Sequence, residues 1–385
     1  MRKIGYTISS MIYEPIAYTA MGLAASMAPI MAVRLRAIFR ATKPPKYTTP
    51  LGDETDLPSV TVCIPARNEQ HALTDCLERV LASTYQKLEI IVLDDVSGDD
   101  TSALIKSFAS SGVRFIQGDP LPQEWLGKNH ALEELLREAN GTYILFMDVD
   151  TRVEPQAIER IIRYAVSHTI DMVSVLPFRN DGWRGSVLAS PLRFFWSLLF
   201  HSPTLPAVSS GSWCIRRSTL ETEFNGFTKL HAAIQPEVTI ARELMKKQRY
   251  HLLVSTAEFG VNYEKKWRSQ LLTSIRLLYP IARYSIANVL LIAFDIAILL
   301  SPWIVLVYGI FQGLLIVSSI AGAVCVAYMT VYGYYAATMW RKGAFLGALL
   351  WPLLLLQELV LVIASGVQYK RKSVTWKGRL VRPAK

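Results

Sequence analysis

The chain has 385 residues, a length that allows one large or two ordinary domains, and 51% of its residues are apolar. Its formal net charge is +10, but the basic residues lie beside the apolar segments and no nucleic-acid-binding motif accompanies them. We therefore exclude nucleic acid as a partner and expect anionic lipid headgroups, meaning a membrane surface. The four cysteines show no paired spacing, so neither a disulfide framework nor a zinc site is expected.

The N-terminal region is apolar. Ile8–Val33 is interrupted by a single charge, Glu14, and is long enough to cross about 30 Å of hydrocarbon as a helix. A signal peptide is the alternative, but the run is long for one. The basic residues after it outnumber those before it: Arg34, Arg36, Arg40, Lys43 and Lys46 against Arg2 and Lys3. We expect residues 1–40 to be a transmembrane helix with a basic flank, followed by a cytoplasmic domain.

After a linker at residues 41–58, strand and helix patterns alternate. Strands are expected at Val60–Ile64 and Leu88–Leu93, and helices at Glu69–Ser83 and Thr101–Ser110. Such alternation predicts an α/β domain with a mostly parallel sheet covered on both sides. Ligands of these sheets bind at the carboxyl ends of the strands.

Polar segments follow three of the expected strands. They are Pro65–Glu69, Asp94–Thr101 and Asp148–Asp150. Asp148 and Asp150 are two residues apart and share one face of a strand, so they can converge on a hard cation, although turn capping is the ordinary role of such residues. No Gly-x-Gly-x-x-Gly follows the first strand, and Gly127-Lys128 lacks the rest of an ATPase phosphate loop, which argues against both of those nucleotide-binding classes.

Several motifs in one order resemble the family 2 glycosyltransferases, which have a GT-A fold, a Rossmann-like nucleotide-sugar-binding domain. The motifs are Val62–Glu69, Asp94–Thr101, Trp125–Leu132, Phe146–Thr151, Gly211–Arg217, Asn225–Phe227 and Gln235–Arg242. The resemblance covers residues 59–270, the expected cytoplasmic catalytic domain. With apolar segments on both sides, the chain is most similar to the lipid-directed branch, which includes ceramide glucosyltransferases, hopanoid-associated transferases and carotenoid-acid glycosyltransferases.

The resemblance also implies roles for individual residues. Asp95 would bind the uracil ring, and Pro65, Arg67 and Glu69 would line the nucleotide pocket. Asp148 and Asp150 would hold Mg²⁺ or Mn²⁺ against the diphosphate, with Lys128 adding a positive charge there. Glu237 would be the catalytic base, although the family usually has Glu-Asp where this chain has Pro236-Glu237. The alternative for Glu237 is a helix N-terminal residue, and Glu243 is the next candidate base.

The sequence allows two interpretations for each of two segments that contain aromatic residues. Trp267 and Arg268 either close the diphosphate pocket or anchor the chain at the membrane interface. Leu188–Val208 is either an interfacial segment that delivers a lipid or a hydrophobic core strip.

The C-terminal region, residues 271–368, predicts two to three transmembrane helices. Its apolar stretches are Ser285–Tyr308, Phe311–Ala336 and Phe345–Val367. Three crossings would put the basic tail, residues 369–385, on the side opposite the catalytic domain, whereas its charge favours the cytoplasm. One segment that re-enters without crossing would remove this conflict.

These observations favour a multi-pass cell-membrane enzyme, an inverting, metal-dependent glycosyltransferase. It would move one hexose from a UDP-sugar to a lipid hydroxyl or carboxyl. A polysaccharide synthase of the same family is the alternative enzyme, and a noncatalytic membrane protein that keeps the fold is the alternative of another class. The donor sugar and the acceptor are not readable from the sequence.

Overall fold

The computed structural model describes residues 2–45 and 57–381. The chain forms two compact units, which we name the helical unit and the sheet unit. The helical unit comprises Met1–Ile38, Asp181–Leu199 and Lys266–Arg371, and the sheet unit comprises Phe39–Asn180, Phe200–Lys265 and Lys372–Lys385. Asp181–Leu199 groups with the apolar helices, and the tail from Lys372 groups with the sheet.

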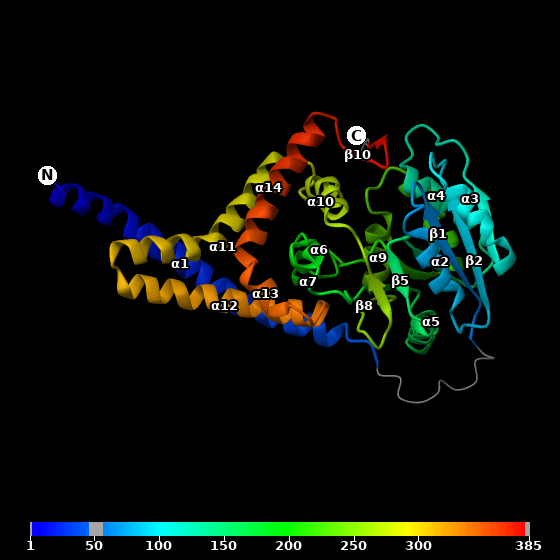
Figure 1. Cartoon of the computed structure of the whole chain (residues 1–385), viewed down its shortest axis with the longest axis horizontal. Helices are drawn as coiled ribbons and strands as arrows, with labels where there is room; N and C mark the ends of the chain where they lie inside the picture. The colour runs from blue at the N-terminus through cyan, green and yellow to red at the C-terminus, as the bar shows by residue number, and fades with distance from the viewer. Residues whose placement is uncertain (1, 46–56, 382–385) are drawn as a thin grey trace. The chain divides into compact units, whose positions relative to one another are not determined.

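The sheet unit is built on a seven-stranded sheet in the order β3-β2-β1-β4-β7-β6-β8 (Figure 1). The strands are β1 Val60–Ala66, β2 Leu88–Asp94, β3 Val113–Gln117, β4 Tyr143–Met147, β6 Met172–Leu176, β7 Ser212–Arg216 and β8 Tyr250–Val254. Strand β7 runs antiparallel to both of its neighbours, and the other pairings are parallel. The expected mostly parallel α/β sheet is confirmed.

Helices cover both faces of this sheet. They are α2 Leu73–Leu81, α3 Thr101–Ser107, α4 Gly127–Glu138, α5 Ala157–Ser167, α8 Arg217–Phe224 and α9 Pro236–Lys246, with short 3₁₀ turns at Ala109–Ser111 and Thr228–Leu230. Because side chains alternate along a strand, Val62 and Ile64 of β1 join the core beneath α2 and α5, whereas Cys63 points to α4. Burial on both faces explains why β1 is a continuous apolar run. The four cysteines are free and buried, as predicted.

Smaller strands complete the sheet unit. Strand β5 (Thr151–Val153) pairs with β9 (Val261–Tyr263) in an antiparallel ribbon. Strand β10 (Thr375–Trp376) pairs with β11 (Arg379–Leu380) in a hairpin made by the tail. The expected helix at Glu69–Ser83 begins later, at Leu73, because residues 69–72 form a turn in which the Glu69 carbonyl accepts hydrogen bonds from the backbone N–H groups of Ala72 and Leu73.

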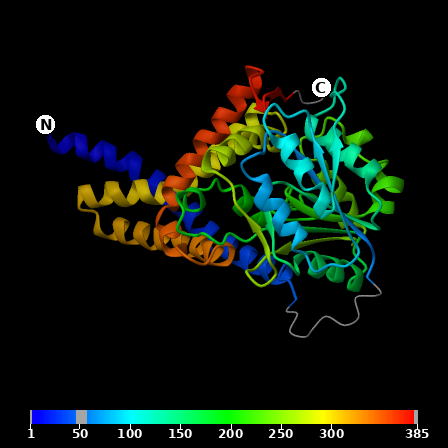
Figure 2. The ribbon, with the colours of Figure 1, turned by 45° about the vertical axis from the view of Figure 1, so that its right-hand side comes forward.

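The helical unit contains long apolar helices. Its members are α1 Arg2–Ala41, α6 Gly185–Leu188, α7 Arg193–Leu199, α10 Trp267–Ile281, α11 Ile286–Gln312, α12 Leu315–Met339, α13 Ala344–Leu349 and α14 Trp351–Lys370. Helices α11 and α12 run side by side, joined by a turn at Gly313, whose φ is +71° (Figures 1 and 2). Within the described residues, four helical segments are long and apolar enough to cross a bilayer: Tyr18–Ala41, Ile286–Gln312, Leu315–Met339 and Trp351–Lys370. The predicted transmembrane helices are thus present.

The start of the aromatic segment Leu188–Val208 belongs to the core of the helical unit. Phe195 is fully buried, with its ring centroid 5.2–5.6 Å from those of Tyr332, Tyr335 and Trp351. The buried Glu358 of α14 accepts a hydrogen bond from the backbone N–H of Leu192 at 3.2 Å. For this part of the segment the structure favours the core alternative.

Candidate active site

Two polar loops lie together at the carboxyl edge of the sheet. Parallel pairing places Ala66, the last residue of β1, opposite Asp94, the last residue of β2. The loops that follow are joined by side chains, because Ser97 Oγ accepts from the backbone N–H of Asn68 at 3.0 Å, and Asn68 Oδ1 accepts from that of Gly98 at 2.8 Å. Asp94 accepts from the backbone N–H of Ser97, so it caps the turn. These hydrogen bonds hold the loops after β1 and β2 together, and we call the two loops the platform. The residues expected to line a nucleotide pocket lie on this platform.

Asp95 is a buried acid of this platform. Both of its carboxylate oxygens lie 2.8 Å from Nη1 of Arg379, and its backbone carbonyl accepts from the Arg67 guanidinium. Burial raises the pKa of Asp95, and the hydrogen bond and charge of Arg379 oppose that rise. Val96, the next residue, has a φ of +52°, which is strained for a β-branched side chain. Arg67 donates to its carbonyl at 2.7 Å and so helps to hold this conformation.

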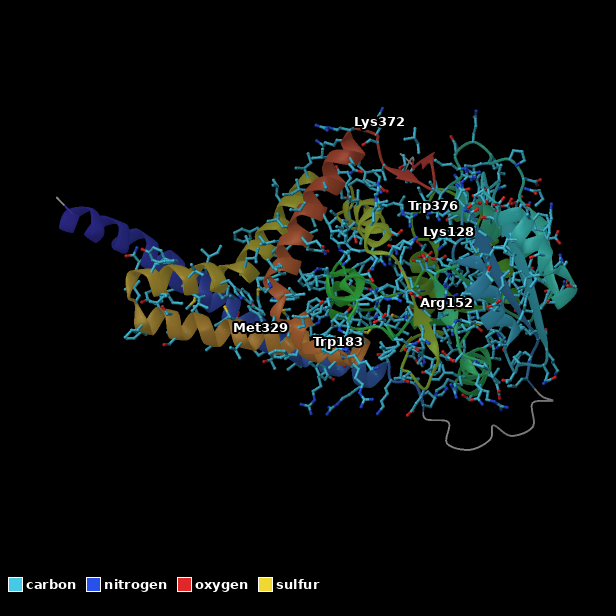
Figure 3. All side chains as sticks on the ribbon, in the orientation of Figure 1. Lys128, Arg152, Trp183, Met329, Lys372 and Trp376 are labelled. Atoms are coloured by element: carbon cyan, nitrogen blue, oxygen red, sulfur yellow. The ribbon has the colours of Figure 1, made fainter. Side chains whose placement is uncertain are left out.

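Asp148 and Asp150 lie in the loop between β4 and β5. The loop is fixed to Gly211, whose carbonyl accepts from the backbone N–H of Asp148 at 3.0 Å and from Thr151 Oγ1 at 2.7 Å. Below it, the buried Arg152 forms an ion pair with Asp75 and donates to the Val149 carbonyl at 2.6 Å (Figure 3). The two carboxylates remain partly exposed, so the fold presents them instead of burying them.

Each of these carboxylates is paired with a lysine. Lys128 Nζ lies 2.7 Å from Asp148 Oδ1, and Lys265 Nζ lies 3.0 Å from Asp150 Oδ2. Lys265 was not predicted as a site residue. It meets Asp150 because β5 and β9 pair antiparallel with Thr151 opposite Tyr263. Burial lowers the pKa of Lys265, but the nearby charges outweigh burial and raise it overall, so this lysine is a cation.

The donor set of this loop fits a hard divalent ion. Among the described residues no group of three His, Cys, Asp or Glu side chains gathers at one point. Within this loop the carboxylates of Asp148 and Asp150 are the candidate ligands. Mg²⁺ is commonly held by one or two carboxylates, with substrate phosphates and water completing its shell. Asp148 and Asp150 would hold such an ion, which would supply positive charge at this loop.

Glu237 is buried at the start of α9, with 2% of its surface exposed. Ser210 Oγ donates to its carboxylate, and Lys128 Nζ donates to the carbonyl of the same serine at 3.1 Å. Burial raises the pKa of Glu237, while Lys128 and the Ser210 hydroxyl lower it and Asp148 raises it further. A carboxylate whose pKa is raised toward neutral pH is suited to accept a proton. Ser210 was missed by sequence reasoning, although it immediately precedes the motif at Gly211.

Glu243, the second candidate base, does not share this environment. It lies on the same helix, with its side chain 47% exposed and paired with Lys246 at 2.7 Å. That pairing lowers the pKa of Glu243. The structure therefore favours Glu237 over Glu243 as the proton acceptor.

The motif at Trp125–Leu132 supports Glu237 indirectly, by holding the chain segment that precedes α9. The buried Asn129 donates to the carbonyls of Leu230, His231 and Ala233 at 2.8, 3.0 and 2.8 Å, which fixes the segment leading into α9. Gly226, with a φ of +63°, lies against the carboxylate of Glu133 and has no room for a Cβ. These two motifs are thus structural supports of the site.

Of the remaining predicted residues, Pro65 and Glu69 lie at the same edge of the sheet. Pro65 pairs with Leu93 in the sheet, and Glu69 Oε1 is 2.7 Å from Lys377 Nζ in the tail. Of the tryptophan–arginine pair, Trp267 donates to the Ala189 carbonyl at 2.8 Å within the helical unit. Lys265 of the neighbouring sequence, and not this pair, contacts the acidic loop within the sheet unit.

Residues 61–223 match the family described as Glycosyl transferase family 2. This part of the chain is therefore similar to the family 2 glycosyltransferases. Poly-beta-1,6-N-acetyl-D-glucosamine synthase of Staphylococcus aureus is 31% identical over 164 residues, which are 42% of this chain and 36% of the synthase. Glycosyltransferase GlyA of Streptococcus pneumoniae is 28% identical over 113 residues, which are 29% of this chain and 16% of GlyA. The chain therefore spans only about a sixth to about a third of these relatives.

The fold has a similar solved structure along nearly the whole chain. The mannosyltransferase PcManGT of Pyrobaculum calidifontis, in complex with GDP-Man and Mn²⁺, superposes with a TM-score of 0.54 at 20% identity. The alignment covers 91% of this chain and 98% of that enzyme. This similarity confirms the expected GT-A fold.

Proposed function

We propose that the protein is a membrane-bound, inverting, metal-dependent glycosyltransferase that moves one hexose from a nucleotide sugar, most simply a UDP-sugar, to a lipid hydroxyl or carboxyl. One observation carries this proposal. Lys128 contacts both Asp148 of the acidic loop and Ser210, which donates to the buried Glu237. A diphosphate-binding group and a proton acceptor with a raised pKa are therefore linked in one network.

This network supports a single displacement. Glu237 takes the proton of the acceptor hydroxyl while the acceptor oxygen forms a bond to the anomeric carbon. The bond from that carbon to the diphosphate oxygen breaks on the opposite face, so the configuration inverts. Lys128 and Lys265, which contact Asp148 and Asp150, would attract the diphosphate leaving group. A Mg²⁺ or Mn²⁺ ion held by Asp148 and Asp150 would supply further neutralisation of the diphosphate.

The long apolar helices of the helical unit support the proposal that the acceptor is a lipid. Four helices of membrane-spanning length would keep the sheet unit at a bilayer, where a hydroxylated or carboxylated lipid is at high local concentration. The synthase relative supports the alternative of a polymerising enzyme. The Ser210–Glu237 contact argues against the noncatalytic alternative, because it preserves a desolvated carboxylate that stability alone does not favour.

One topology removes the conflict over the tail. Phe200–Lys265 and Lys372–Lys385 belong to the same compact sheet unit, which supports placing both segments on one side of the membrane. With both on one side, the chain between them crosses an even number of times, so α11, α12 and α14 do not all cross. We propose that α11 and α12 form the crossing pair, that α14 does not cross, and that the sheet unit and basic tail are both cytoplasmic. Protease protection of a C-terminal tag in inside-out and right-side-out vesicles tests this arrangement.

The activity is tested with the purified protein in nanodiscs of defined lipid. Candidate donors are UDP-glucose, UDP-GlcNAc and GDP-mannose, each with Mn²⁺, Mg²⁺ or chelator, and the readout is nucleotide release together with mass spectrometry of the lipids. Metal-dependent transfer of one hexose to a lipid is expected. Long products on a gel would identify a polysaccharide synthase, and donor binding without turnover in the presence of total cell lipid would favour the noncatalytic alternative.

A further inference from the structure

The basic tail folds into a rigid hairpin. Trp376 of β10 pairs with Arg379 of β11 across a two-residue turn. The turn residues Lys377 and Gly378 have φ values of +47° and +82°. Positive φ at both positions is typical of a type I′ turn, which is preorganised for a tight hairpin. Val374 before the hairpin is 3% exposed, so its base is packed as well.

The hairpin contacts the platform at the carboxyl edge of the sheet. Arg379 binds both carboxylate oxygens of Asp95, and Lys377 Nζ pairs with Glu69. The Lys377 carbonyl also accepts from Nε of Arg67 at 3.1 Å. All three residues on the platform are those for which the sequence resemblance implies contact with the nucleotide. A tail about 280 residues away in sequence thus meets the base end of the expected donor site.

Trp376 and Arg379 converge on one point of this site. Residues directly opposite across a hairpin point to the same face. A Cβ added to Gly127, the first residue of α4, would lie 2.7 Å from Arg379 Nη1 and 3.4 Å from both Asp95 Oδ2 and the Trp376 ring. Trp376 accordingly lies close to Lys128, the next residue of α4 (Figure 3). An aromatic face, a guanidinium and a carboxylate therefore surround the same position.

We propose that this hairpin forms one wall of the subsite for the donor's nucleobase, an inference that rests on the proposed function. Arg379 holds the Asp95 carboxylate ionised and oriented, and the carboxylate retains lone pairs that accept a ring N–H. Uracil N3–H and guanine N1–H are both suitable donors. Trp376 supplies the face on which the base stacks. Because Asp95 is 3% exposed, the hairpin lifts when the nucleotide enters and closes on it.

The test measures nucleotide binding and not transfer, so that it can fail separately from the proposed function. The Kd of UDP and of GDP with Mn²⁺ is measured by calorimetry for the full-length protein in detergent, and pyrophosphate with Mn²⁺ serves as a probe without a base. Arg379→Ala is expected to raise the Kd of the preferred nucleotide roughly ten-fold to a hundred-fold, the size expected for a lost charge-assisted hydrogen bond. The Kd of pyrophosphate should stay unchanged.

Two further variants separate this role from a structural one. Arg379→Lys keeps the charge and is expected to restore part of the affinity. Lys370→Ala removes an equivalent charge from the exposed end of α14 and should leave every Kd unchanged. Equal losses for nucleotide and pyrophosphate, or no loss in Arg379→Ala, would overturn the inference. Tighter nucleotide binding in Arg379→Ala would overturn it in favour of an inhibitory plug. If nucleotide binding depends on Arg379 but the protein shows no transferase activity, the inference about the nucleobase subsite is supported and the proposed function is refuted.

Discussion

Replacing Glu237 with glutamine tests the chemistry most directly. Glutamine keeps the volume of the side chain and can still accept the hydrogen bond from Ser210, but it cannot take a proton. Loss of a general base lowers the rate by about 10²–10⁴-fold. At about 1.4 kcal/mol per ten-fold change, this corresponds to roughly 3–5 kcal/mol in the barrier to transfer. Binding of the donor should change little, because in the proposed mechanism the carboxylate acts on the acceptor and not on the donor.

The environment of Glu237 also predicts a pH dependence. Burial raises its pKa, so the fraction of ionised base, and with it kcat, should fall with decreasing pH already above the ordinary glutamate range. Ser210→Ala removes a hydrogen bond to the ionised form, worth about 1.5–3 kcal/mol. At about 1.36 kcal/mol per pH unit, the acidic limb of the kcat profile should move upward by about one to two pH units. A profile that does not move would show that Ser210 does not support the base.

The same shift has a consequence for stability. A carboxyl group with a raised folded-state pKa stabilises the fold below its unfolded pKa, and this stability is lost as pH rises through the folded pKa. Glu237→Gln should therefore unfold at the same or a higher Tm than the wild type at pH 7, despite its low activity. Glu243→Gln on the exposed face of the same helix is the matched control and should leave kcat unchanged. If Glu237→Gln keeps kcat within about three-fold at saturating donor, Glu237 is not the base.

Three other substitutions test the rest of the site. Asp150→Ala should abolish transfer and metal-dependent UDP binding while the protein stays folded, and persistent Mn²⁺-dependent activity would remove it as a ligand. Lys265→Ala removes the ammonium that competes for Asp150, so the Kd of Mn²⁺ measured without nucleotide should fall; an unchanged or higher Kd would show that Lys265 does not compete. Gly226→Ala forces a Cβ against Glu133 at a φ of +63° and should lower the Tm, by a free energy of about 1–3 kcal/mol, whereas Gly185→Ala, with open space around it, should not.

The fold was predictable where its signals are local. The apolar run of β1 and the helical spacing of apolar residues in α2 and α3 can be recognised from short stretches of sequence. Side chains on one face recur every two residues in a strand and about every 3.6 residues in a helix. Element ends were less predictable. The turn at residues 69–72 depends on hydrogen bonds with the segment after β2, including one from the Glu69 backbone N–H to Thr101 Oγ1 at 2.9 Å. These partners are about 30 residues away in sequence, so the helix propensity of residues 69–72 does not reflect them.

By itself, the sequence determined the apolar helices, the alternating strands and the acids at three strand ends, since composition and spacing alone specify them. Through the resemblance of its motifs to a known family, it also predicted roles for Asp95, Asp148, Asp150 and Glu237. Only the tertiary structure decided which cations meet these acids. Lys265 reaches Asp150 through the pairing of β5 with β9, and Arg379 reaches Asp95 from the other end of the chain. The sign and spacing of a charge are local properties, but its partner is set by how distant strands and loops come together.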